Sequence, residues 1–430
     1  MRDRPIVREM STLLSGNVLA QVISLAAYFA LTRIFSAEDY GLYSIFYSYI
    51  EVLIILSTCK YELAIVAADT DSEAQAMARF TLRLNAIVST VLLTVVLALW
   101  LAGALPGNFV QLGWMVLLIP PMVFFCGTSR VYSFLFNRGH HYSTMALSET
   151  VNAAAGAIIK IGLGLLGVLQ AGMPVGTVAG RAVGNLVYRL KKSEVGVRSS
   201  EDSANEKSAL RPPTSALLAV ARKHVNFPRY VATKDFINSF SSNLPFLWLA
   251  LYFDRADVGL FALALTFTFR PVNILNVAFE QVLYARTAEG VREGRSVSGM
   301  IGRFLLILNM VALPLFVLAW FVAEPVFAFC FGGRWAGCGV YVQALLPWVY
   351  LMLSSTSLMF VSNVFSTQKT EFGFYLVLLA LRVAAIAVGI HAGSFLLAIR
   401  LYATAGALVA ASLLVWYLWQ VRRYEHLLRQ

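Results

Sequence analysis

The sequence is poor in charge: Asp, Glu, Lys and Arg make up 13% of its 430 residues, whereas 59% are hydrophobic and the mean hydropathy is +0.70. Length alone would suggest two or three soluble domains, but no water-soluble core requires so much apolar surface. The composition therefore predicts a membrane protein. Its net charge of +11 comes from 34 Lys and Arg against 23 Asp and Glu, so the position of each cation is informative.

Cysteine is scarce as well. Cys59, Cys126, Cys330 and Cys338 include no CxxC pair, which excludes a zinc ribbon or a dithiol redox motif, and they are too few for a disulfide scaffold. Cys330 and Cys338 could form one disulfide if their loop faces an oxidising compartment, or could be two small apolar residues. There is no Walker A sequence, so ATP is not expected to be the direct energy source, and no metal or other cofactor is expected.

Apolar stretches of about 20 residues, the length that crosses a bilayer as a helix, occur twelve times. They cover residues 12–32, 41–59, 84–102, 110–130, 146–168, 172–190, 236–253, 258–280, 301–323, 340–364, 372–391 and 394–419. No small-residue cleavage site follows the first stretch, so we expect it to remain as a transmembrane helix.

The distribution of Lys and Arg sets the orientation of these spans. With the N-terminus in the cytoplasm, 26 of the 34 cations lie on cytoplasmic segments, three on the opposite side and five inside spans. Positive charge gathers in cytoplasmic loops, so this asymmetry predicts twelve helices with both termini cytoplasmic. It also accounts for the basic composition without a nucleic-acid partner. The external loops are short and leave no room for a globular domain.

The chain divides near its midpoint. A polar, basic segment predicts a disordered cytoplasmic linker at 191–226 between two six-helix lobes, 1–190 and 227–430. A shift of 218 residues aligns Asp39 with Asp257, Gly41 with Gly259 and Glu62 with Glu280, which indicates an internal repeat. We therefore predict an all-α membrane protein, twelve transmembrane helices in two pseudo-two-fold-related six-helix bundles around a central cavity.

The repeated aspartates have two interpretations. Asp39 and Asp257 each precede a Gly at the predicted start of a helix, where a carboxylate accepts a backbone N–H as an N-cap. Alternatively Glu38 and Asp39 form an acidic pair on an outer loop, available for metal or acid–base chemistry. Ala256 stands opposite Glu38 in the second copy, so the structural cap is favoured.

Five cations lie inside predicted spans, where a charge facing lipid costs roughly 2.5–3.5 kcal/mol. We expect them to face the cavity and to bind substrate; they are Lys160, Arg181, Arg270, Arg382 and Arg400. Polar residues on spans one, two, seven and eight are predicted to line the cavity or to couple transport, namely Asn17, Gln21, Ser48, Glu51, Asn243, Thr266 and Asn273. The small polar residues could equally be hydrogen bonds between helices.

This chemistry favours an anionic substrate. Guanidinium groups bind phosphate through paired N–H donors. An antiporter of cationic drugs needs carboxylates inside the membrane, and Glu51 is the only candidate that the spans suggest. An inside-negative potential favours outward movement of an anion by about 2.3 kcal/mol per charge per 100 mV.

Several ordered segments resemble the polysaccharide biosynthesis proteins of the Wzx-type lipid-linked oligosaccharide flippases. They are SGNVLAQVISL, LTRIFSAEDYGLYSIF, KYELAIVAADTDSEA, FPRYVATKDFINSFSSNLPFLWLALYF, DVGLFALAL and FGGRWAGCGVYVQALLPW, which extend the resemblance over residues 10–420. Arg334 departs from the acidic residue usual before the Trp in this family, so no shared role is assigned there.

The resemblance implies the multidrug, oligosaccharidyl-lipid and polysaccharide exporter fold in the bacterial inner membrane. It also implies a substrate of undecaprenyl pyrophosphate carrying an oligosaccharide repeat unit of O-antigen, capsule or exopolysaccharide, with coupling to H+, Na+ or the membrane potential. Membrane lipid, a polymerase and a chain-length regulator are the implied partners. We expect a transporter and not an enzyme; the alternatives are a cation-coupled multidrug exporter of the same fold and a membrane glycan ligase or polymerase.

Overall fold

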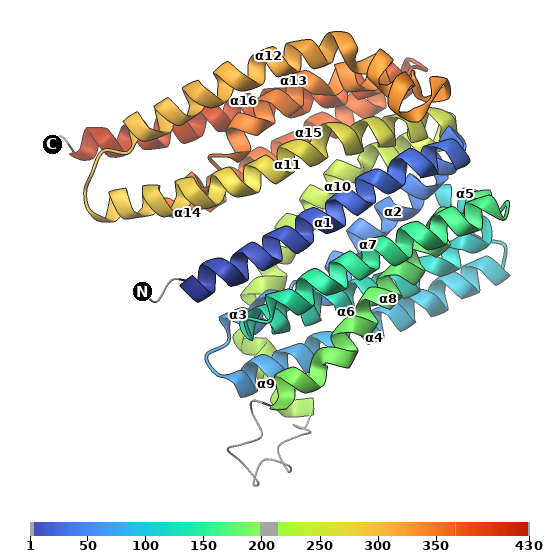
Figure 1. The fold of residues 1–430 in the computed structure, drawn as a ribbon, viewed down its shortest axis with the longest axis horizontal. Coiled ribbons are helices and arrows are strands. Elements are labelled where there is room, and N and C mark those ends of the chain that lie inside the picture. The colour runs from blue at the N-terminus through green and yellow to red at the C-terminus, as the bar shows by residue number, and fades with distance from the viewer. Residues whose placement is uncertain (1–3, 198–213, 366, 429–430) are drawn as a thin grey trace. The chain divides into compact units, whose positions relative to one another are not determined.

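The computed structural model describes the backbone of residues 4–197, 214–365 and 367–428, with most of their side chains. The described chain is helical and forms two compact units, 1–239 and 240–430. Figure 1 shows the order of the helices along the chain. The apolar stretches predicted from the sequence lie mainly on helices, because long runs of such residues satisfy their backbone groups within the helix itself.

The first unit contains helices α1 to α9 and the first part of α10. Their bounds are α1 Arg4–Ile34, α2 Ala37–Thr58, α3 Glu62–Ala67, α4 Asp71–Leu101, α5 Asn108–Leu112, α6 Ile119–Arg138, α7 Tyr142–Leu165, α8 Leu169–Val197, α9 Thr214–Lys223 and α10 Thr233–Trp248. A π-helical segment, Phe227–Ala232, leads into α10.

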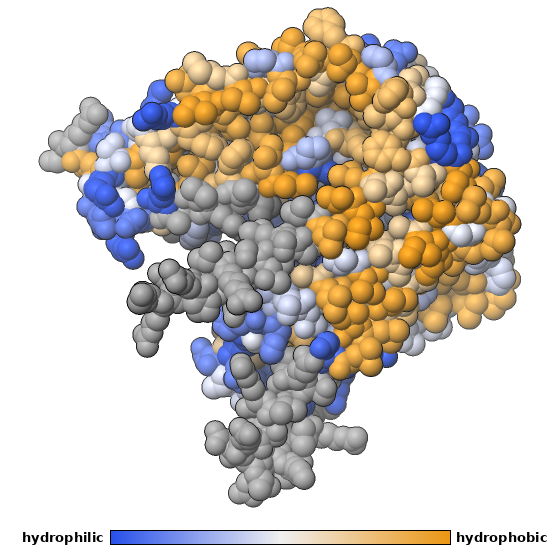
Figure 2. Space-filling model, viewed as in Figure 1, coloured by the Kyte–Doolittle hydropathy of each residue, from blue (hydrophilic) through white to orange (hydrophobic). Residues whose placement is uncertain are grey.

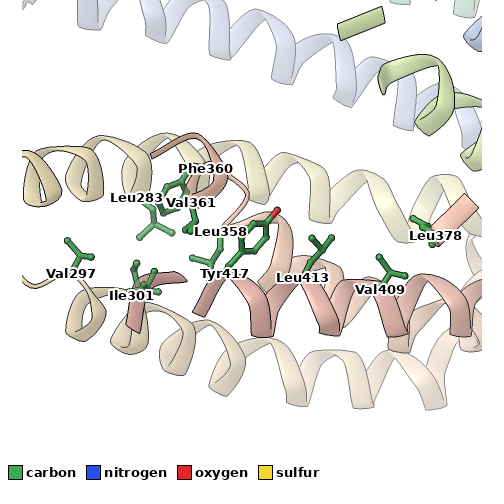
Figure 3. Packing of buried hydrophobic residues seen from close by; sticks show 11 residues of the cluster. Leu283, Val297, Ile301, Leu358, Phe360, Val361, Leu378, Val409, Leu413 and Tyr417 are labelled. Carbon is green, nitrogen blue, oxygen red and sulfur yellow. The ribbon is translucent and has the colours of Figure 1, made fainter. Parts of the chain in front are cut away.

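The second unit contains the end of α10 and helices α11 to α16. Their bounds are α11 Arg255–Arg292, α12 Ser298–Phe331, α13 Cys338–Thr356, α14 Phe360–Val364, α15 Gln368–His391 and α16 Phe395–Leu428. A hydrophobic cluster joins α11, α12, α14, α15 and α16 in its interior, with Leu358, Val361 and Tyr417 at or below 1% exposure (Figure 3).

Within the described residues, eight helical stretches are long and apolar enough to cross a membrane. They are Ala37–Thr58, Asp71–Leu101, Asn108–Arg138, Arg255–Asn276, Ser298–Phe331, Cys338–Val364, Gln368–His391 and Phe395–Leu428. Neither α7 nor α8 is among them, since Glu149, Lys160 and Arg181 interrupt their apolar sequence. Figure 2 shows apolar side chains over the outer face of α12, where Met310 and Phe321 are 66% and 74% exposed, as expected of a lipid-facing helix.

The repeated aspartates act in the first turns of their helices. Ser36 is the N-cap of α2, and Asp39 completes a capping box by accepting the Ser36 backbone N–H at 2.9 Å. In the second unit Asp254 is the N-cap of α11, whereas Asp257 accepts a hydrogen bond from the Tyr341 hydroxyl at 2.9 Å. The predicted capping function is thus found for Asp39, at the third helical position instead of the N-cap itself, and not for Asp257.

The segment between the lobes differs from the expected disordered linker at both of its ends. Helix α8 continues to Val197, and α9 begins at Thr214. Leu217 and Ala221 of α9 are buried, and Lys223 forms ion pairs with Asp69 and Glu73 at 2.7 and 2.8 Å. These contacts stabilise residues 214–223 as a helix, because they bury its apolar side chains and pair its charge. Residues 198–213 lie outside the described part of the chain.

The four cysteines are free thiols in the structure, including Cys330 and Cys338. Cys338 is buried and its thiol contacts the carbonyl oxygen of Leu260 at 3.3 Å. This matches the alternative in which the two residues pack as small apolar side chains.

Helices α7 and α8 approach closely along a row of glycines. Gly172, Gly176, Gly180 and Gly184 recur every fourth residue of α8, and a Cβ at Gly180 would lie 2.7 Å from the Cα of Gly156 on α7. Such small residues let two backbones approach and exchange polar contacts in a membrane. The Ser148 hydroxyl accordingly donates a hydrogen bond to the Gly184 carbonyl at 2.9 Å.

Replacing Gly180 by Val is expected to separate these helices and to lower the free energy of unfolding by about 1–3 kcal/mol, the usual cost of overpacking. Thermal unfolding of the purified protein in detergent measures the change. Gly162→Val on α7 is the matched control, since nothing lies within 4 Å of a Cβ at Gly162. Equal midpoints for the two variants would show that the α7–α8 approach does not require glycine.

Candidate functional site

A charged cavity of about 510 Å³ lies within the first unit. Five segments contribute to its lining: α2, the residue Lys60 that follows α2, α6, the α7–α8 pair and the start of α10. The polar lining residues are Tyr47, Glu51, Lys60, Ser129, Arg130, Ser133, Glu149, Arg181, Asp235, Asn238 and Ser239. Three of them are basic and three are acidic.

The pair formed by Arg181 and Glu149 spans the cavity wall between α8 and α7. Arg181 Nη1 lies 2.8 Å from Glu149 Oε1 and 3.4 Å from Ser129 Oγ on α6. The side chains of Arg181 and Glu149 are 22% and 36% exposed, so the pair is partly accessible from the cavity. Arg181 follows Gly180 directly, and the close glycine contact therefore brings its guanidinium within reach of α7.

A second ion pair also lines the cavity. Lys60 Nζ lies 2.6 Å from Asp235 Oδ2, which joins the end of α2 to the start of α10. Cys59 and Lys60 adopt positive φ angles of 47° and 60°, a conformation that is costly for residues other than glycine and that ends α2 abruptly. The Ser239 hydroxyl adds a hydrogen bond to the Glu51 carbonyl oxygen at 3.1 Å.

The third cavity cation, Arg130 on α6, faces the buried carboxylate of Glu62. The closest approach is 3.9 Å, and the Glu62 side chain is only 2% exposed while that of Arg130 is 37% exposed. Each basic residue that lines the cavity therefore has a carboxylate within 4 Å. The sequence predicts five cations in a cavity; Arg181 is the one of them that lines the cavity of the first unit, whose three basic and three acidic lining residues balance in charge.

Cys59 and Lys223 are among the ionisable groups outside the membrane-spanning helices that have shifted pKa values. Burial, and then the nearby Glu62 carboxylate, raise the pKa of the Cys59 thiol. Hydrogen bonds to Asp69 and Glu73 raise the pKa of Lys223 above its usual value. His224 Nε2 also lies 3.0 Å from Glu73, so α9 is held by the same acidic corner between α3 and α4.

Among the predicted site residues of the first unit, Arg181 and Glu51 line the cavity. Lys160 lies on α7, half-buried, with its ammonium 5.1 Å from the centre of the Tyr43 ring. Ser48 is buried and donates to the Ser44 carbonyl at 2.7 Å, away from the cavity lining. Gln21 is exposed on α1, and the side chain of Asn17 lies outside the described residues.

The other predicted residues belong to the second unit. Arg270 is half-buried on α11, where the Thr266 hydroxyl donates to the Ala262 carbonyl and Asn273 is exposed. Asn243 is buried on α10, and Arg400 is exposed on α16. Arg382 differs from the rest because it is a fully enclosed cation, 2% exposed.

The guanidinium of Arg382 is stacked between two aromatic rings. It lies 4.8 Å from the centre of the Trp348 ring and 4.4 Å from that of Tyr402, and its Nη1 donates to Ser241 Oγ at 3.1 Å. Among the described residues no carboxylate forms an ion pair with it, and its Nε has no hydrogen-bond partner. Burying a charge without an ion-pair partner lowers the stability of a fold, and such a cost is retained mainly where the residue has a function.

Arg382→Met is therefore expected to raise the free energy of unfolding by about 1–2 kcal/mol, because desolvation of a charge is avoided while part of the stacking is lost. The thermal unfolding midpoint measures this change in stability. Arg422→Met, at the exposed end of α16, is the control. A lower midpoint for Arg382→Met would mean that the stacked guanidinium stabilises the fold.

Sequence reasoning missed Lys60, Arg130, Glu149 and Asp235 as parts of one cavity. The Lys and Arg pattern predicts Lys60 and Arg130 only as two of the 26 cytoplasmic cations, and Glu149 lies at the start of the predicted span 146–168. The regular glycines of α8 were the available signal, since they predict a close partner helix for Arg181. No cluster of three or more potential His, Cys, Asp or Glu metal ligands occurs among the residues that the structure describes.

Long apolar helices around a charged cavity are the architecture of an all-helical, multi-span membrane protein. The fold is shared with an inward-facing multidrug resistance MATE family transporter of the MOP superfamily, at a TM-score of 0.65 and 13% identity over 94% of this chain and 96% of that one. It is also shared with the lipid II flippase MurJ, at a TM-score of 0.69 and 10% identity, over 97% of this chain and 91% of that one. A third structure with this fold is a MOP superfamily transporter from Pyrococcus furiosus. Its TM-score is 0.63 and its identity 13%, over 98% of this chain and 96% of that one.

The chain belongs to the polysaccharide biosynthesis protein family, whose model matches residues 30–340. Its fold is the one found in these MOP superfamily structures, as the resemblance predicted. Among curated protein sequences, none is significantly similar to it.

Proposed function

We propose that this protein is a flippase for an undecaprenyl-pyrophosphate-linked oligosaccharide repeat unit, the precursor of an O-antigen, capsule or exopolysaccharide. It would move the headgroup from the cytoplasmic to the periplasmic leaflet by alternating access while the lipid tail stays in the bilayer. The supporting observation is the charged cavity of the first unit, where Arg181, Arg130 and Lys60 gather among apolar helices.

Arginine side chains in this cavity are suited to a diphosphate. The guanidinium presents its N–H donors in a planar fork that matches phosphate oxygens, and in a site of low dielectric such contacts are stronger than in water. The hydroxyl and amide groups of Ser129, Ser133 and Asn238 line the same space and are suited to sugar hydroxyls. Lys160, Arg270, Arg382 and Arg400 are proposed as further contacts to the acidic headgroup during transport.

We further propose the full topology predicted from the sequence, twelve transmembrane helices in two six-helix lobes, 1–190 and 227–430, joined by a cytoplasmic linker, with both termini cytoplasmic in the bacterial inner membrane. In this orientation an inside-negative potential favours outward movement of a diphosphate by about 2.3 kcal/mol per charge per 100 mV. H+ or Na+ coupling through Glu51 would add to it. A polymerase and a chain-length regulator would receive the product.

A cation-coupled multidrug exporter is the second candidate. It is favoured by the three carboxylates that line the cavity, Glu51, Glu149 and Asp235, because a cationic drug needs such groups. The two functions differ in the sign of the charge that the cavity binds.

Ligand-dependent thermal stability separates them. Purified protein in nanodiscs is expected to be stabilised by undecaprenyl pyrophosphate, by about 2.7 kcal/mol at a hundredfold excess over its Kd, and not by ethidium or another lipophilic cation. Stabilisation by the cation alone would select the drug exporter.

A further inference from the structure

The cavity of the first unit contains its own anions. Its three cations each face one carboxylate: Lys60 faces Asp235 at 2.6 Å, Arg181 faces Glu149 at 2.8 Å and Arg130 faces Glu62 at 3.9 Å. Unpaired cations would be expensive to keep inside a membrane protein. The pairing removes this cost but also occupies the groups that a phosphate would use.

The three pairs differ in how easily a ligand could replace the carboxylate. Glu62 is buried behind Arg130 at 2% exposure, and the Lys60–Asp235 pair joins the chain ends of two helices. Glu149 instead lines the cavity directly and is 36% exposed. It is therefore the carboxylate that can move aside without unpacking a helix.

Arg181 and Glu149 both have contacts that suit an exchange. Arg181 binds Glu149 and Ser129 through one nitrogen, Nη1, while its buried Nε has no hydrogen-bond partner within the described chain. A guanidinium has five N–H donors in all, so Arg181 can also donate to a larger oxyanion. Glu149 Oε2 already accepts a hydrogen bond from Asn152 Nδ2 at 3.4 Å, one turn along α7, which can hold the carboxylate once Arg181 has left it.

We propose that Glu149 is an internal competitor of the substrate: it occupies Arg181 in the resting cavity, is displaced by the diphosphate group, and returns to Arg181 to release that group. This inference rests on the proposed function for its substrate and adds a residue that sets affinity and release. When the diphosphate leaves, the carboxylate of Glu149 again pairs with Arg181, so the cavity can bind a dianion and then release it. Transport requires both steps. The ligand chemistry is a diphosphate, whether free or lipid-linked.

The test is titration of the full-length protein in nanodiscs with inorganic pyrophosphate, by calorimetry. Glu149→Gln keeps an oxygen that can accept from Arg181 but removes the competing charge, so binding is expected to become about tenfold tighter, the lower end of the coupling between close charge pairs. The double variant Glu149→Gln, Arg181→Gln is expected to lose this gain. Glu38→Gln, an exposed carboxylate at the far end of α2, is the matched control and is expected to bind as the wild type does.

Two further results separate this inference from the proposed function. In proteoliposomes Glu149→Gln is expected to flip the glycolipid more slowly, with pyrophosphate inhibiting it at about tenfold lower concentration than it inhibits the wild type. Pyrophosphate that binds without inhibiting flipping would overturn the assignment of the site to the lipid headgroup. Unchanged affinity in Glu149→Gln, beside a wild type that transports, would overturn the competitor role alone; a wild type that does not transport would overturn the proposed function.

Discussion

Replacing Arg181 by Gln is expected to slow flipping of a pyrophosphate-linked glycolipid about a hundredfold. The substitution removes a charge-assisted donor from the diphosphate, worth about 1.5–3 kcal/mol. It also leaves Glu149, at present 2.8 Å from the guanidinium, as an uncompensated negative charge on the path of an anion. Both effects act in the same direction, so this variant should be the most defective among single changes in the cavity.

Initial rates in proteoliposomes, corrected for the amount of folded protein, measure this loss. Arg189→Gln is the control, since Arg189 lies two turns further along α8, is exposed, and does not line the cavity. Arg181→Lys should be intermediate because it retains the charge without the planar fork. A rate for Arg181→Gln within twofold of the wild type would exclude Arg181 from headgroup binding.

Reversing one charge of the Lys60–Asp235 pair should have the second largest effect. Lys60→Glu would place two carboxylates where Nζ and Oδ2 now lie 2.6 Å apart, and the end of α2 would repel the start of α10. Truncating or reversing a close charge pair costs about 2 kcal/mol or more. Because Asp235, Asn238 and Ser239 at the start of α10 line the cavity, we expect about tenfold slower transport as well as a lower unfolding midpoint.

The double variant Lys60→Glu, Asp235→Lys restores opposite charges and should recover most of the stability and rate. The comparison isolates the pair, because each single change is present in the double variant. A double variant as defective as either single one would show that the positions matter for another reason, such as the positive φ angle at Lys60.

The sequence predicted the helices well because a membrane helix is a local pattern. The apolar run that begins near residue 301 is visible without any partner, and the structure extends it over the whole of α12, Ser298–Phe331. The first-turn role of Asp39 was also local, although the hydrogen bond to Ser36 shifts the start of the helix from Gly41 to Ala37. The helix α9 at the end of the linker could not be predicted from a local pattern. It is stabilised by ion pairs of Lys223 with Asp69 and Glu73, which lie some 150 positions earlier in the sequence.

The charged cavity was only half predictable, for a physical reason. A cation inside a span is conspicuous, and Arg181 was recognised for that. Its partner Glu149 lies 32 positions earlier on another helix, and Asp235 is far from Lys60 along the chain, so only tertiary packing reveals that the charges balance. The row of glycines from Gly172 to Gly184 is the sequence feature that would have pointed to α7 as the partner of α8.

The most direct measurement is the movement of a defined undecaprenyl-pyrophosphate-linked oligosaccharide across the membrane of proteoliposomes that contain only this protein. The proposed function predicts that the glycan becomes accessible to an impermeant glycosidase or lectin on the far side, faster than in protein-free vesicles, and that Arg181→Gln returns the rate towards that background. Wild-type protein that leaves the glycolipid in its original leaflet, while it transports a lipophilic cation, would contradict the account.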